Sequence, residues 1–174
     1  MAVGLSENLP YPSLDGITKD ECTLRMLSPA YAGAKGELTA VLQYIYQSML
    51  FDKWSNAEYA DTLEKIAISE MRHIDLLGGA IARLGALPVY ASSLPCAAGY
   101  YSAYDINYTH TPQTMILADI RAESMAIEEY KKIISCIDNE QIVALVERII
   151  LDEELHLKIF RDLYCKLVNG AADS

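Results

Sequence analysis

Apolar residues return every three to four positions along four segments of the chain, which is the spacing of one face of an α-helix. The pattern predicts helices at about residues 28–51, 55–85, 111–137 and 140–168. Polar residues cover the other faces of each segment, so the four apolar stripes are expected to be buried against one another. The sequence therefore predicts an all-α protein built around a four-helix bundle.

The connections between these segments predict how the helices are arranged. Short turns at about 52–56 and at 138–139 force the helices on either side of each turn to be antiparallel neighbours. Residues 86–111 instead contain prolines, glycine and a cluster of tyrosines that break a helix. Twenty-six extended residues cover about 85 Å, more than the length of the bundle. We therefore expect an antiparallel four-helix bundle with one long crossover between its second and third helices.

A chain of 174 residues is expected to form one domain. Residues 1–27 contain two prolines and little helical period, which predicts an extended N-terminal arm. Ser28-Pro29 is typical of a helix start, so the bundle is expected to span residues 28–170 and to be followed by a frayed tail at 171–174. The first residues lack the charged and apolar regions of a signal peptide, which predicts a cytoplasmic location.

Charge and cysteine content narrow the classes of function. The net charge is −10, from 24 acidic and 14 basic side chains, and such a surface disfavours nucleic acid and anionic membranes as partners. No apolar run is long enough to cross a membrane. The four cysteines are scattered without any C-x-x-C pair, so we expect buried free thiols rather than a local iron or zinc site.

The same arrangement of glutamate and histidine occurs twice. Glu37 is followed 33 residues later by Glu70-x-x-His73, and Glu123 is followed 30 residues later by the Glu-x-x-His of residues 153–156. Residues three apart share a face of a helix, so each Glu-x-x-His pair points the same way. Four glutamates and two histidines directed into one bundle form the ligand set of a dinuclear metal site. The predicted metal ligands are Glu37, Glu70, His73, Glu123, Glu153 and His156.

The repeat extends beyond the predicted ligands. In both halves an alanine follows the lone glutamate by three residues and a tyrosine follows it by seven, which places Tyr44 and Tyr130 at equivalent positions. Either tyrosine could be a core residue with a satisfied hydroxyl, and Tyr44 is our candidate catalytic residue, as a hydrogen-bond donor to a ligand or as an electron source. Asp119 could accept a hydrogen bond from a ligand histidine, or could be a surface or capping residue. The repeat predicts approximate two-fold symmetry about the metals.

The chemistry of the ligands indicates which metals they would hold. Buried carboxylates without a counter-charge are very costly, and two divalent metals supply about four positive charges. A donor set rich in oxygen with two imidazoles suits iron or manganese better than zinc. We therefore expect two Fe ions, with Mn as the alternative.

The strings Gly36-Glu37-Leu38-Thr39-Ala40, Ser69-Glu70-Met71-Arg72-His73 and Leu151-Asp152-Glu153-Glu154-Leu155-His156 resemble ferritin-like dinuclear carboxylate proteins, the superfamily of bacterioferritins, rubrerythrins and manganese catalases. The resemblance covers most of residues 29–168 and implies the ferritin-like form of the bundle. It implies that Glu70 and Glu153 bridge the two metals. It also places Met71 where some bacterioferritins bind haem between subunits, although a core or interface methionine is the simpler interpretation.

The resemblance implies an oxidoreductase of the peroxidase or ferroxidase type that reacts with peroxide or dioxygen. An electron donor protein would be a partner if the protein is a peroxidase, and the chain is expected to form a homo-oligomer, at least a dimer. Two alternatives stay open: iron storage of the bacterioferritin type, and peroxide disproportionation of the manganese catalase type. This chain departs from rubrerythrins at Ala126, where they carry a second glutamate, and has no rubredoxin-type domain.

Overall fold

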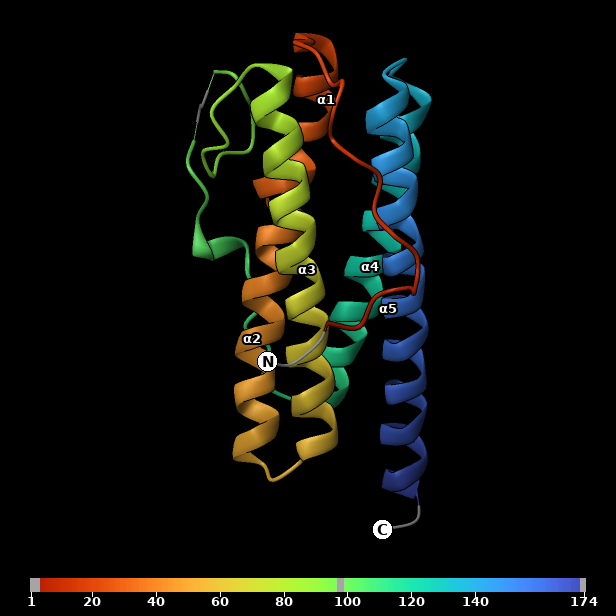
Figure 1. Cartoon of the computed structure of the whole chain (residues 1–174). Coiled ribbons are helices and arrows are strands. Elements are labelled where there is room, and N and C mark those ends of the chain that lie inside the picture. The colour runs from red at the N-terminus through yellow and green to blue at the C-terminus, as the bar shows by residue number, and fades with distance from the viewer. Residues whose placement is uncertain (1–3, 97–98, 173–174) are drawn as a thin grey trace.

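The structure, a computed structural model, describes residues 4–96 and 99–172, the last three of these by their backbone alone. Its four long helices are α2 (Glu37–Lys53), α3 (Ala57–Leu84), α4 (Pro112–Ser135) and α5 (Glu140–Ala172). They pack as two antiparallel pairs, α2 with α3 and α4 with α5 (Figure 1). The all-α four-helix bundle predicted from the sequence is confirmed.

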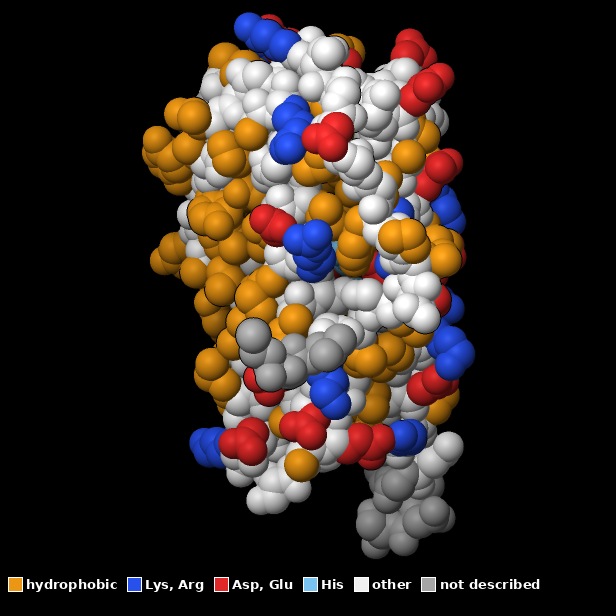
Figure 2. Space-filling view, in the orientation of Figure 1, with side chains coloured by type: hydrophobic (Ala, Val, Ile, Leu, Met, Phe, Trp, Pro, Cys, Tyr) orange, Lys and Arg blue, Asp and Glu red, His pale blue; other side chains and the backbone are white. Residues whose placement is uncertain are grey.

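The crossover between α3 and α4 runs down the outside of the bundle, so that α3 and α4 are parallel (Figure 1). Its described residues contain a short 3-10 helix, η1 (Ala103–Asp105), and a single β-bridge between Ala91 and Tyr100. Its tyrosines pack against the bundle only in part. Tyr90 stacks on Tyr31, which belongs to a further helix before the bundle, whereas Tyr104 is 98% exposed. Figure 2 shows hydrophobic side chains gathered on this side of the molecule.

The extended arm is shorter than predicted, because a further helix, α1 (Glu21–Ala32), precedes the bundle. Its true start signal is Asp20, whose carboxylate accepts hydrogen bonds from the backbone and hydroxyl of Thr23. Pro29 therefore lies inside α1 rather than at the start of a bundle helix. The chain bends between α1 and α2 at Gly33–Gly36, where a Cβ on either glycine would come within 2.5 Å of a backbone oxygen of α1. The first bundle helix consequently begins at Glu37.

Two other helix ends differ from the prediction. The helix expected from about residue 55 begins at Ala57, because Ser55 lies in the turn with a φ of 58° and Asn56 occupies the position before the helix. Helix α5 continues past the predicted end at about residue 168 as far as Ala172. Only residues 171 and 172 of the predicted tail are described, and both are helical; residues 173–174 lie outside the described part.

The core consists of two apolar clusters separated by a polar layer. One cluster surrounds Leu77 and Leu145 toward α1, and the other surrounds Leu63 and Phe160 toward the opposite end. Between them α3 and α5 carry buried charged side chains. None of the helices in the described part of the chain combines the length and apolar character of a membrane span. The prediction of buried thiols is wrong, since all four cysteines are free and exposed.

Candidate metal centre

The six side chains predicted as metal ligands converge in the polar layer in the middle of the bundle. Each helix of the bundle contributes: α2 and α4 give one glutamate each, and α3 and α5 give one Glu-x-x-His each. All six side chains are at most 5% exposed. Those residues are Glu37, Glu70, His73, Glu123, Glu153 and His156. The helical period therefore brings together residues that lie up to 119 positions apart in the sequence.

The donor atoms fall into two overlapping groups, each compact enough to surround one ion. The first group is Glu37, Glu70, His73 and Glu153, and the second is Glu70, Glu123, Glu153 and His156. In each group, one ligand atom from every residue lies within 4.8 Å of the ligand atoms of the others. Glu70 and Glu153 belong to both groups, which is the arrangement expected of bridging carboxylates.

Both histidines turn the same ring nitrogen toward the carboxylates. His73 Nδ1 lies 2.7 Å from Glu70 Oε2 and 3.1 Å from Glu153 Oε1. His156 Nδ1 lies 2.8 Å from Glu70 Oε1, but these two atoms are not aligned for a hydrogen bond. Glu70 Oε1, Glu153 Oε1 and His156 Nδ1 are all buried without a hydrogen-bond partner. Buried ligand atoms that face one another without hydrogen-bond partners fit a metal ion between them.

The outward nitrogens of the two histidines are held by different partners. His156 Nε2 lies 2.7 Å from the backbone carbonyl oxygen of Leu5, and His73 Nε2 lies 3.1 Å from Asp152 Oδ2. A carbonyl oxygen can only accept, so Nε2 of His156 must carry a proton. In the neutral ring the lone pair is then on Nδ1, which faces the carboxylates. This tautomer is the one that a metal ligand in this position requires.

Asp152 also anchors the N-terminal arm, which passes over α5 and α3 (Figure 1). Its carboxylate accepts hydrogen bonds from the Glu7 backbone N–H and the Tyr11 hydroxyl, both at 2.7 Å, and lies 2.8 Å from Arg148 Nη1. Arg148 in turn donates to the carbonyl oxygens of Glu7 and Leu9. The arm therefore seals one side of the site and fixes both histidines.

The arm contacts were not found by sequence reasoning. Asp152 offered a local signal, because it directly precedes the Glu153-x-x-His156 string and lies one helical turn after Arg148. The Leu5 carbonyl offered none, since any residue supplies a backbone oxygen. Asp119, predicted as a possible partner of a ligand histidine, is buried and instead accepts hydrogen bonds from the side-chain amides of Gln43 and Gln47.

Each of the two tyrosines of the repeat contacts a glutamate of the other half. The Tyr44 hydroxyl of α2 donates to Glu123 of α4, and the Tyr130 hydroxyl of α4 donates to Glu37 of α2. Each tyrosine thus holds the lone glutamate of the opposite half, which is the relation that a two-fold axis through the cluster produces. The two-fold pattern predicted from the repeat is present in these contacts.

When no metal is bound, the pKa values of the cluster's carboxylates shift in opposite directions. Burial, and then the nearby charge of Glu153, raise the pKa of both Glu37 and Glu123 well above its usual value. Burial alone would raise the pKa of Glu153 as well, but the neighbouring Glu123 and the two nearby histidines hold it well below its usual value. Burial would lower the pKa of His156, yet the carboxylates of Glu70 and Glu153 raise it to about 10. In the metal-free cluster a proton is therefore held more readily by Glu37 and Glu123 than by Glu153.

The family model for the ferritin-like domain matches residues 33–168. The chain belongs to the ferritin-like family. The bacterioferritin of Mycolicibacterium paratuberculosis is 28% identical over 124 residues, which cover 70% of this chain and 72% of that protein. The bacterioferritin of Desulfovibrio desulfuricans is 29% identical over 136 residues, covering 76% and 70%.

Solved structures show the same ferritin-like fold. KatB, a manganese catalase from Anabaena, superposes with a TM-score of 0.80 at 23% identity, covering 92% of this chain and 79% of its own. The Desulfovibrio desulfuricans bacterioferritin, whose diiron site was captured in different catalytic states, superposes with a TM-score of 0.71 at 25% identity, covering 84% and 80%. The predicted ferritin-like fold, with its single long crossover, is confirmed.

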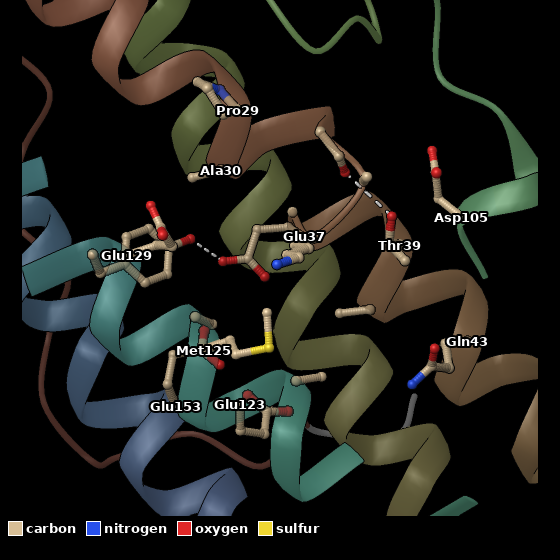
Figure 3. A pocket seen from close by; sticks show the side chains of 18 of the residues that line it. Pro29, Ala30, Glu37, Thr39, Gln43, Asp105, Glu123, Met125, Glu129 and Glu153 are labelled. Atoms are coloured by element: carbon tan, nitrogen blue, oxygen red, sulfur yellow. Dashed lines mark hydrogen bonds between the residues drawn. The ribbon is translucent and has the colours of Figure 1, made fainter. Parts of the chain in front are cut away.

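This ferritin-like chain also has an open side. A cavity of about 680 Å³ lies between α2 and α4, below the bend from α1 to α2. Figure 3 shows Glu37, Glu123 and Glu153 at its inner end and Met125 pointing into it from α4. Both alanines of the repeat, Ala40 and Ala126, line it, so the small residue one turn after each lone glutamate leaves open space. Met71, the residue at the haem position of some bacterioferritins, is 44% exposed on α3.

Proposed function

We propose that this protein is a non-haem dinuclear iron oxidoreductase, with manganese as the alternative metal, that reacts with peroxide or dioxygen. Glu37 with His73 would hold one ion and Glu123 with His156 the other. Glu70 and Glu153 would bridge the pair. The observation that carries the proposal is the overlap of two four-residue donor groups that share those two glutamates.

The bound metals would supply the electrons that reduce the oxidant. Reduction of one hydrogen peroxide to two waters consumes two electrons and two protons, so the residues around the oxidant must also deliver protons. Tyr44 is the proposed catalytic residue, because its hydroxyl lies against Glu123 at the inner end of the cavity. The N-terminal arm excludes water from one side, and the cavity leaves a route for the oxidant on the other. A peroxidase of this kind would also require an electron donor protein.

Anaerobic reconstitution with Fe(II) followed by addition of peroxide or dioxygen tests this function. We expect two Fe per chain, a ferric absorbance change and consumption of at least one of the two oxidants. A protein that binds two Fe(II) but reacts with neither oxidant would rule out the proposed activity while leaving the metal site intact.

Calorimetric titration of metal-free variants tests the ligands separately from the activity. Glu70→Ala removes a bridge and should weaken both metals together, whereas Glu37→Ala removes a terminal ligand and should mainly weaken one. Glu64→Ala, an exposed glutamate on the same helix as Glu70, is the matched control and should leave both sites unchanged. If Glu70→Ala and Glu37→Ala also bind two metals with unchanged affinity, the ligand assignment is wrong.

Iron storage is a second candidate, favoured by the bacterioferritin relatives. A storage protein must enclose its mineral, so a large hollow assembly on sizing would support it and a dimer would exclude it. Disproportionation of the manganese catalase type would instead give Mn in the protein as isolated and release dioxygen from peroxide. Elemental analysis of the protein from its native host separates these candidates most directly.

We also propose that the chain forms a homo-oligomer through the crossover side. Large apolar side chains are exposed there, with Leu87 78% and Tyr100 75% exposed (Figure 2). Burying such a patch against a second copy would remove apolar surface from water. A haem at Met71 would likewise require a second subunit, because this side chain lies on the outer surface of α3. Absorbance in the Soret region of the isolated protein would test for haem.

A further inference from the structure

The cavity between α2 and α4 is much larger than peroxide or dioxygen requires. Its volume is about 680 Å³, whereas a water molecule occupies roughly 30 Å³ in the liquid. Sites for organic ligands typically measure about 300–1,000 Å³. The cavity therefore has room for an organic molecule beside the carboxylate cluster.

The walls of the cavity are mostly apolar between its charged mouth and the carboxylates at its inner end. Helix α4 presents Ala118, Ala122 and Ala126 at four-residue steps. Helix α1 contributes Pro29 and Ala30, which lie above Glu37 in Figure 3. Residues four apart share a helix face, so α4 has a smooth wall of small side chains along the cavity. Small side chains leave the space between the two walls unfilled.

Polar contacts fix the width of this space. Asp119 of α4 is tied to α2 by Gln43 and Gln47, whose side-chain amides donate at 2.7 and 2.9 Å. The same Gln43 accepts the backbone N–H of Asn107, which holds the crossover as a third wall. The inner end of the cavity reaches Glu153, whose buried Oε1 makes no hydrogen bond.

The mouth of the cavity carries positive charge on a protein whose net charge is −10. Four of the 14 basic residues line it, together with the exposed acids Asp105 and Glu129. Within the part of the chain that the structure describes, Lys35 and Arg121 form no ion pair, whereas the other two basic side chains each face a glutamate. Those two are Arg25 and Lys132. Such a mouth attracts an anion and disfavours Fe(II) as a passing ion.

We propose that this cavity binds an organic monoanion with an apolar body, whose charged group lies near Lys35 and Arg121 and whose apolar part lies along the alanine wall. The charge of the mouth and the apolar walls each match one part of such a ligand. Binding needs the cavity and not the metals, so this proposal can fail without affecting the proposed oxidoreductase, and the reverse also holds.

Titration of the metal-free protein with octanoate, octan-1-ol and acetate tests the proposal. Octanoate should bind more tightly than either of the others, since octanol lacks the charge and acetate lacks the apolar body. The double variant Lys35→Glu/Arg121→Glu should bind octanoate about tenfold more weakly, because two exposed charges that attract the carboxylate are replaced by two that repel it. Arg161→Glu, an exposed residue of α5 away from the cavity, is the matched control and should bind octanoate as the wild type does.

Ala126→Phe fills the inner part of the cavity and should abolish octanoate binding; circular dichroism of the variant checks that it is folded. If Ala126→Phe is not folded, the Lys35→Glu/Arg121→Glu variant still tests the proposal, because its two substitutions are on exposed side chains. Three results would each overturn the proposal: no saturable octanoate binding, equal binding of octanoate and octanol, or equal loss in the Arg161→Glu control. A wild-type assembly that excludes octanoate would overturn it as well, because a second copy of the chain would then occupy the cavity.

Discussion

Replacing Asp152 by asparagine removes the charge that ties the N-terminal arm to α5 and to His73. The Asp152 side chain is fully buried, and its partner Arg148 is 6% exposed. Burial would raise the pKa of Asp152, but hydrogen bonds from His73, Arg148 and Tyr11 lower it from 3.8 to about 2. A shift of that size corresponds to about 2 kcal/mol of folding stability at neutral pH. The variant also leaves a buried guanidinium without its counter-charge, and breaking a buried pair costs about 3–5 kcal/mol.

We therefore expect Asp152→Asn to lower the free energy of unfolding of the metal-free protein by about 2–5 kcal/mol at pH 7. The assay is urea unfolding. Because the pKa of Asp152 is depressed, its contribution is complete above pH 3.8 and is lost as the pH falls through about 2. The difference from wild type should therefore shrink below pH 4. Asp162→Asn, which removes an exposed partner of Lys158 on the same helix, is the control. A loss no larger than that of this control would refute the role given to Asp152.

Two further predictions concern the cluster itself. Metal affinity should rise steeply with pH between about 6 and 9, because His156, whose pKa is raised to about 10, must lose a proton before it can bind a metal. Mn(II) titrations in buffers of different ionisation enthalpy would measure the proton release. An affinity that does not depend on pH would contradict this prediction. Tyr44→Phe and Tyr130→Phe should each weaken one metal about equally, since the two hydroxyls donate to equivalent glutamates; loss of both metals in either variant would argue against separate roles.

The sequence was sufficient for the bundle and for the six clustered side chains because both depend on helical period. Leu63, Ile66 and Leu77 repeat on one face of α3, and Glu70 and His73 follow the same period within it. Any helix that buries that apolar stripe must also bury those two polar residues. The long crossover was predictable for a similar reason, since two parallel helices require a connection as long as the bundle.

The start of the first helix was not predictable by the same reasoning. Ser28-Pro29 has the composition of a helix start, but Pro29 lies inside α1. A proline inside a helix costs about 3 kcal/mol, which favourable packing elsewhere along the helix can offset. Asp20 competes as a cap, and burial of Leu24 and Leu27 against the bundle stabilises the helix that follows it. Tertiary packing decided between the two signals, and a local pattern does not contain that information.

The arm contacts depend on partners that are far apart in the chain. The Leu5 carbonyl meets His156 across 151 residues, and the Glu7 backbone meets Asp152 across 145. Backbone donors and acceptors have no sequence signature, so only the folded chain shows that an arm rich in proline completes the site. The described residues before α1 form neither helix nor strand, and their role at the site was not foreseen.

These arm contacts also break the symmetry that the repeat creates. The two donor groups match residue for residue, yet His73 faces an ionised carboxylate and His156 faces a neutral carbonyl. A carboxylate partner makes an imidazole a more basic ligand than a carbonyl partner does. The group with Glu37 and His73 should therefore bind its metal more tightly than the group with Glu123 and His156. Calorimetric titration of the metal-free wild type should then show two steps of unequal affinity, and two identical sites would mean that the arm does not influence the metals.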